Sequence, residues 1–129
     1  MGAVKKSKSP RFIGIPQHVA HSEEFAALKG NEVKLLIDLL VQYYGRNNGK
    51  LSPTLALMKK RGWASSSLYR AHTGLLKKGF VVVTRQGWKQ RGRPTLVAIT
   101  WNRIDECDID YDEGIRSSAT PLNSWRKKQ

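Results

Sequence analysis

The clearest absence in this chain is of acidic residues. No Asp or Glu occurs between Leu39 and Ile104, which is about half of the 129 residues. Protein surfaces normally mix charges of both signs, and a folded segment of one sign repels itself. Phosphate backbones relieve that repulsion and release condensed counterions when cations bind them. The absence therefore favours a polyanionic partner. Thirteen cations occupy the stretch: Arg46, Lys50, Lys59, Lys60, Arg61, Arg70, Lys77, Lys78, Arg85, Lys89, Arg91, Arg93 and Arg103.

Cysteine is almost absent as well. Cys107 stands alone, which excludes an intrachain disulfide and a thiolate metal cluster. Neither Cys107 nor the three histidines, His18, His21 and His72, have metal-ligand spacing, and no phosphate loop or nucleophile motif occurs. We therefore expect no enzyme, no metal and no cofactor, and no small-molecule ligand is evident.

Long apolar runs are also missing. No stretch reaches the roughly 18 residues that a membrane span requires. The first ten residues, MGAVKKSKSP, are basic but no apolar segment follows, so we do not expect a secretory signal. With a net charge of +13, the chain is expected in the cytoplasm, associated with the nucleoid, and not at a membrane.

Composition divides the chain into three parts. Residues 1–17 form a basic arm with two prolines, which we expect to be flexible and either to contact a backbone or only to solubilise the chain. Residues 18–104 form one domain, and residues 105–129 form an acidic and then basic tail. The tail either shields the basic surface or is solvated, and beyond residue 117 we expect disorder except where Leu122 and Trp125 dock. A calcium loop is rejected, because Glu113 stands where that motif needs Gly.

Helix signals are dense before the acid-free stretch. Ser22 is expected to cap a short helix over residues 23–28, which Gly30 ends. Asn31 is expected to cap a core helix over residues 32–44. This helix is apolar except for one stripe, so its surplus apolar surface leaves room for a homodimer contact, through residues 32–44 or through the termini. The stripe consists of Lys34, Asp38 and Gln42.

Two further helices and a hairpin are predicted inside the stretch. Ser52-Pro53 starts a helix over residues 53–61, ended by Gly62, with Leu55 and Met58 facing the core. The next helix starts at Ser65 or Ser66 and runs to residue 78. Its apolar face contains Leu68, Ala71, His72, Leu75 and Leu76, and another face carries Ser66, Arg70, Thr73 and Lys77.

The remainder of the domain has the pattern of strands. Residues 50–51 can form a very short strand, and residues 80–85 and 95–101 are rich in β-branched residues. Residues 86–94 between the two longer strands form a glycine-rich basic loop, so we predict a hairpin with a long tip. Trp63 and Trp101 are expected in the core. Gly74 is unfavourable inside a helix, and a close approach of the backbone to the core helix or to DNA are both open explanations.

In residues 51–58, 63–70 and 75–84 (LSPTLALM, WASSSLYR and LLKKGFVVVT) the chain resembles the winged helix-turn-helix superfamily. More specifically, it looks like small helix-turn-helix proteins of bacterial phages and other mobile elements. The resemblance implies an α+β fold with a helical core and a C-terminal β-hairpin wing. It also implies binding of double-stranded DNA and a role in transcription regulation.

The expected interface follows from groove geometry. A recognition helix over residues 66–78 fits the major groove, and the wing over residues 86–94 fits the minor groove or the backbone. Base reading is assigned to Ser66, Ser67, Arg70 and Thr73, with Arg70 on guanine, and Tyr69 to a phosphate or a thymine methyl. Phosphate contacts are assigned to Ser52, Thr54, Lys59, Lys60 and Lys77. The wing contributes Lys89, Arg91 and Arg93, and Trp88 either packs under it or stacks on an unpaired base.

Three functions are compatible with these patterns. The first is a sequence-specific, double-stranded DNA-binding transcriptional regulator that acts as a dimer. The second is a replication or transfer initiator, or an accessory protein, of a mobile element. The third is a protein-interaction module without DNA binding, which uses residues 33–44 and the acidic tail. The sequence does not separate activation from repression.

Overall fold

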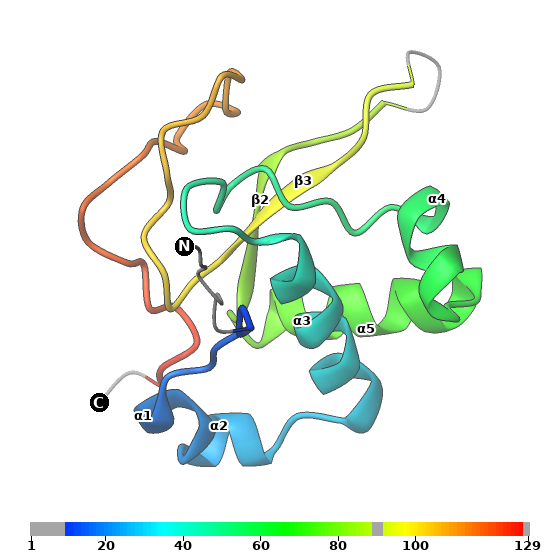
Figure 1. Cartoon of the computed structure of the whole chain (residues 1–129), viewed down its shortest axis with the longest axis vertical. Helices are drawn as coiled ribbons and strands as arrows, with labels where there is room; N and C mark the ends of the chain where they lie inside the picture. The colour runs from blue at the N-terminus through cyan, green and yellow to red at the C-terminus, as the bar shows by residue number, and fades with distance from the viewer. Residues whose placement is uncertain (1–9, 89–91, 128–129) are drawn as a thin grey trace, which may run out of the picture.

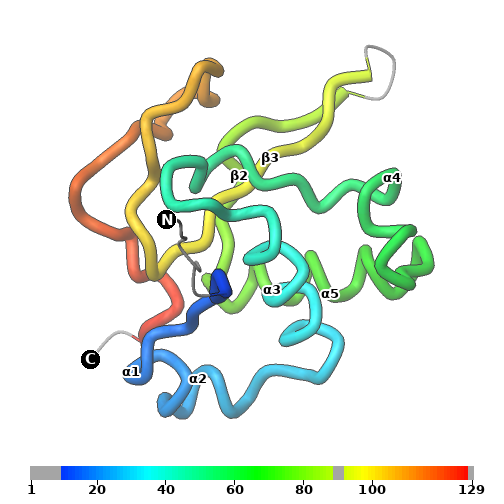
Figure 2. Tube along the Cα trace, in the orientation of Figure 1, coloured from blue at the N-terminus to red at the C-terminus, as the bar shows by residue number. Residues whose placement is uncertain are grey.

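The computed structural model describes residues 10–88 and 92–127 and has an α+β architecture (Figure 1). Helices pack on one side of a two-stranded antiparallel hairpin, and the C-terminal segment lies along its other side (Figures 1 and 2). The Lys89, Gln90 and Arg91 part of the hairpin tip and residues 1–9 lie outside the described residues. The elements are α1 (Gln17–Ala20), α2 (Glu23–Ala26), α3 (Gly30–Gln42), α4 (Leu55–Met58), the 3-10 helix η1 (Lys59–Arg61), α5 (Ser65–Lys77), β2 (Val81–Arg85) and β3 (Leu96–Ile99).

Helix α3 is central, and its start differs from the expectation. Ser22 caps α2 as predicted, since its hydroxyl accepts from the Phe25 amide at 3.0 Å. The predictions that Gly30 ends a helix and that Asn31 caps the next were wrong. Gly30 is the first residue of α3, because the Glu32 carboxylate accepts the Lys29 amide at 2.8 Å and begins the helix earlier.

Helices α4, η1 and α5 follow the predicted order with a shifted start. The predicted helix over residues 53–61 begins only at Leu55, with Thr54 at its N-cap position. Ser52 does not cap it, because its backbone is bound by the Gln42 side chain at 2.7 and 2.8 Å. Leu55 was wrongly expected in the core, since it is 38 % exposed, whereas Met58 is buried as predicted. Gly62, with φ of 91°, ends η1 as expected.

The hairpin pairs β2 with β3 antiparallel, from Val81 opposite Ile99 to Arg85 opposite Leu96. A bulge places one extra residue, Thr84, on β2. The predicted short strand at residues 50–51 is a single bridge, in which Leu51 and Val97 exchange backbone hydrogen bonds of 2.7 and 3.2 Å. The bridge ties the segment before α4 to the hairpin.

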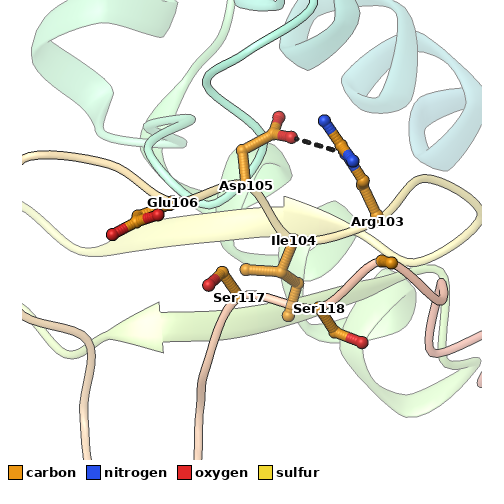
Figure 3. A pocket seen from close by; sticks show the side chains of 7 residues that line it. Arg103, Ile104, Asp105, Glu106, Ser117 and Ser118 are labelled. Atoms are coloured by element: carbon orange, nitrogen blue, oxygen red, sulfur yellow. Dashed lines mark hydrogen bonds and ion pairs between the residues drawn. The ribbon is translucent and has the colours of Figure 1, made fainter.

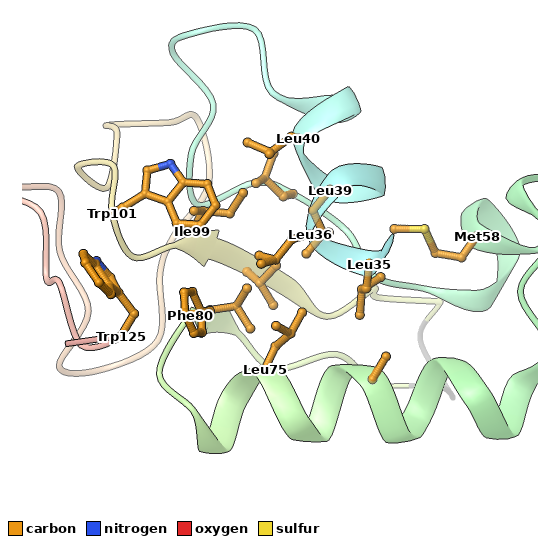
Figure 4. Packing of buried hydrophobic residues seen from close by; sticks show 14 of the residues in the cluster. Leu35, Leu36, Leu39, Leu40, Met58, Leu75, Phe80, Ile99, Trp101 and Trp125 are labelled. Atoms are coloured by element: carbon orange, nitrogen blue, oxygen red, sulfur yellow. The ribbon is translucent and has the colours of Figure 1, made fainter. Parts of the chain in front are cut away.

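The core lies between α3, α5 and the hairpin (Figure 4). Trp63 and Trp101 are buried, as predicted. Phe80, at the turn into β2, is fully buried and stacks on Trp125 with ring centroids 6.0 Å apart. The helical side of the core is formed by Leu35, Leu36, Leu39, Leu40, Leu68, Ala71 and Leu75.

Residues 117–127 pack against the domain, which corrects the expectation of disorder for this described part of residues 117–129. The Ser118 amide donates to the Ile104 carbonyl at 3.1 Å, and Ser117 and Ser118 lie opposite Ile104 in Figure 3. The Asn123 amide donates to the Thr100 carbonyl at 2.8 Å. Trp125 docks as predicted, whereas Leu122 stays 51 % exposed. Nowhere in residues 10–88 and 92–127 is a helix long and apolar enough to cross a membrane.

Candidate nucleic-acid interface

The outward face of α5 carries the side chains expected to read bases. Ser66, Arg70 and Lys77 are exposed, Thr73 is half-buried, and Tyr69 is 71 % exposed. The opposite face is anchored, with Leu68, Ala71 and Leu75 buried against the core. Ser67 is half-buried, and its hydroxyl donates to the Ala64 carbonyl at 3.3 Å, so it lies closer to the turn than the other polar residues.

Two of the residues that the sequence assigns to phosphate contacts lie beside the start of α5. Lys59 and Lys60 are both exposed on η1, and α4 contacts both η1 and α5. In Figure 1, α4 and the first turns of α5 lie together at the right of the molecule, away from the acidic segment. Ser52 is buried and its hydroxyl bonds to Thr54, so the assignment of Ser52 to a phosphate contact was wrong.

A buried carboxylate fixes the turn between α4 and α5. Asp38 accepts Lys34 Nζ, Arg61 Nε and Trp63 Nε1, each at 2.7 Å. Burial alone would raise the pKa of Asp38, but these three hydrogen bonds outweigh it and hold the pKa below its usual value of 3.8. The polar stripe of α3 therefore holds the segment before α5 at both ends. Gln42 binds Ser52, and Asp38 binds Arg61 of η1 and Trp63 just after it. These contacts, which we call the clamp, set where α5 begins.

A second carboxylate, Glu32, fixes the far end of α5. It pairs with Lys78 at 2.6 Å and lies where a Cβ at residue 74 would be. The Glu32 side chain of α3 therefore explains why residue 74 is glycine, and a contact with DNA is not needed to explain it. His72 adds no charge near neutral pH, because burial lowers its pKa from 6.5.

The wing presents a paired aromatic ring and cation. Trp88 and Arg93 exchange backbone hydrogen bonds of 2.9 and 3.1 Å, and the Arg93 guanidinium carbon lies 4.4 Å from the Trp88 ring centroid. Arg93 is half-buried. Lys89 and Arg91, the other predicted wing contacts, lie outside the described residues.

Acidic residues from outside the stretch neutralise only part of its cations. Asp108 pairs with Lys50 at 2.7 Å, which raises the pKa of Lys50 and lowers that of Asp108. Asp112 accepts the Gln86 amide at 2.7 Å and lies 3.6 Å from Arg93, while its own amide donates to Thr84. The tail thus braces the base of the wing.

The remaining cations of the stretch separate into two groups. Arg61, Lys78 and Arg103 also have carboxylate partners, at 2.7, 2.6 and 3.3 Å. Within residues 10–88 and 92–127, no ion pair involves Arg46, Lys59, Lys60, Arg70, Lys77 or Arg85. The outward face of α5 and η1 therefore keeps its positive charge uncompensated.

Exposed apolar side chains lie at the C-terminal end of α3 and just beyond it. Val41 and Tyr44 are 49 and 60 % exposed, and they line one pocket together with Phe12 and Ile13 of the N-terminal segment. Over the described part of the chain, no cluster of three or more His, Cys, Asp or Glu side chains could hold a metal ion. Comparison with protein-family models, curated proteins and solved structures finds no significant match to this chain.

Proposed function

We propose that this protein is a winged helix-turn-helix that binds double-stranded DNA in a sequence-specific manner and regulates transcription. One observation carries the proposal: the outward face of α5 presents short polar groups and cations that make no ion pair among the described residues, while its inner face is buried in the core. A protruding helix with that division has the shape and the hydrogen-bonding groups for a major groove.

In this proposal Arg70 reads a guanine edge, and Ser66, Ser67 and Thr73 contact neighbouring bases. Lys59, Lys60 and Lys77 neutralise phosphates and so position the helix without specifying sequence. The wing, with Lys89, Arg91 and Arg93, contacts the adjacent minor groove or backbone. Thr54, half-buried at the start of α4, is retained as a phosphate contact.

The homodimer remains a prediction. Phe12, Ile13, Val41 and Tyr44 are the exposed apolar side chains available for it. In that arrangement the two copies would bind two half-sites whose spacing follows the dimer geometry.

The test is selection of bound sequences from random duplex DNA, followed by affinity measurements against salt. We expect one motif to be enriched, and log K to fall with log salt at a slope of about −4 or steeper, since each neutralised phosphate contributes about −0.9. A pool without enrichment, together with a nearly flat salt dependence, would contradict the proposal and favour a protein-interaction module.

A further inference from the structure

A groove between α4 and the wing is not explained by contacts to phosphates. It encloses about 730 Å³, and its apolar walls include Leu55 and Leu57 on one side and Trp88 and Pro94 on the other. Leu55, Leu57 and Trp88 are 38, 48 and 45 % exposed. Single exposed apolar side chains are ordinary, but several around one groove mark a binding surface.

The wing side of this groove is preorganised. Trp88 and Arg93 are directly opposite each other, joined by both of their backbone hydrogen bonds, so their side chains share one face of the hairpin. Gly87 allows the two arms of the hairpin to approach closely, because a Cβ there would overlap the backbone at residues 93–95. The Gly87 amide also donates to Thr95 Oγ1 at 3.0 Å. The indole is therefore held in place before any ligand arrives.

Charge around the groove selects an anionic ligand. Arg93 is charged and no acidic side chain is among the described residues that line the groove. Its Nε is buried without a hydrogen-bond partner in the described part of the chain, and its Nη2 lies 3.6 Å from Asp112 Oδ1, which is longer than a hydrogen bond. The guanidinium thus has donors left for an oxyanion. Lys59 and Lys60 follow α4 directly.

We propose that this groove binds an unpaired nucleobase of a DNA strand, stacked on Trp88, with its phosphate at Arg93. The inference rests on the proposed function and deepens it. An intact duplex hides the faces of its bases, whereas a separated strand offers apolar π-faces and phosphates together, which is what the groove accepts. The protein then prefers DNA whose strands are open beside the duplex site.

The test compares three fluorescent probes that carry the selected motif: a fully matched duplex, the same duplex with a short unpaired bubble beside the motif, and the single strand. We expect the bubble to bind about tenfold more tightly than the matched duplex. Trp88→Ala should remove this preference, because it weakens binding of the bubble far more than binding of the matched duplex, and Trp88→Phe should retain most of it. Leu57→Ser should reduce it.

Arg70→Ala is the matched control, because it should weaken bubble and matched duplex by the same factor. Equal affinity of the wild-type protein for bubble and duplex overturns the inference. So does a Trp88→Ala variant that weakens both equally, and so do groove variants that bind every probe normally, which would point to a protein occupant. If the wild-type protein does not bind the matched duplex but binds the bubble in a Trp88-dependent manner, the result supports base binding in the groove. The same result contradicts the proposed binding of double-stranded DNA.

Discussion

Cations on two sides of this molecule have opposite surroundings. On η1 and the outward face of α5, Lys59, Lys60, Arg70 and Lys77 make no ion pair among the described residues. Elsewhere in the stretch, five cations each lie near a carboxylate. They are Lys50, Arg61, Lys78, Arg93 and Arg103. All of these carboxylates come from outside the acid-free stretch.

The two groups of cations show where the few acidic residues act in the fold. Asp38 and Glu32 are buried, and they position α5, whereas Asp108 is exposed, Asp112 is half-buried, and both hold the tail against the domain. Exposure does not separate the two groups, since Lys50, Arg61 and Arg103 are paired although they are exposed. Position does, because the acids lie beside these cations and away from the outward face of α5. Four experiments test whether paired and unpaired cations have these different roles.

The largest effect is expected at the Asp38 clamp. Asp38→Asn should lower the free energy of unfolding by about 2–4 kcal/mol, because it weakens two charge-assisted hydrogen bonds and the one from Trp63. Since the folded pKa lies below 3.8, the carboxylate's contribution is complete above the unfolded pKa and is lost as pH falls through the folded pKa. Urea titrations from pH 7 to pH 3 should show this loss in wild type and a flatter profile in Asp38→Asn. A variant as stable as wild type would contradict the claim that the Asp38 hydrogen bonds stabilise the fold.

Next comes the contrast between an unpaired and a paired cation. Arg70→Ala should weaken binding of the selected duplex by about 10- to 100-fold, as expected for loss of a bidentate base contact. Lys50→Ala, which removes a cation bound to Asp108, should change affinity by no more than about twofold. Fluorescence anisotropy at fixed salt measures both. Equal effects would mean that pairing does not mark the interface.

A smaller effect tests the seam at Gly74. Ala is better than Gly in most helices by about 1 kcal/mol. Here Gly74→Ala should instead destabilise the protein by about 1 kcal/mol, because Glu32 must move and weaken its contacts with Lys78 and the Lys29 amide. In a Glu32→Ala background the same substitution should stabilise. Thermal unfolding of the four variants forms a double-mutant cycle, and additivity would show that Glu32 and residue 74 do not interact.

The smallest effect concerns the brace beneath the wing. Asp112→Asn keeps an oxygen for the Gln86 amide but removes the negative charge near Arg93, so duplex affinity should rise by about two- to fourfold. Asp110→Asn changes the net charge equally, and no ion pair of Asp110 is found among the described residues, so it serves as the control. If affinity falls in Asp112→Asn, the carboxylate supports the wing and does not compete with phosphate.

Local patterns predicted most of the helical order and the hairpin. The Ser22 cap, the end of η1 at Gly62 and the buried face of α5 depend on neighbouring residues, which is why they could be predicted. The start of α4 and the exposure of Leu55 could not be, because both depend on Gln42 binding Ser52 from another helix. The polar stripe of α3 was visible in the sequence, but its partners Arg61 and Trp63 are far away along the chain.

The one-signed charge of the central stretch and the polar outward positions of α5 follow from the amino-acid order alone, because composition and helical period need no knowledge of long-range contacts. Only the tertiary structure decided which cations stay unpaired, why residue 74 is glycine, and that the tail to Trp125 packs against the domain. Each of these depends on contacts between residues distant in sequence, whose geometry no local pattern contains.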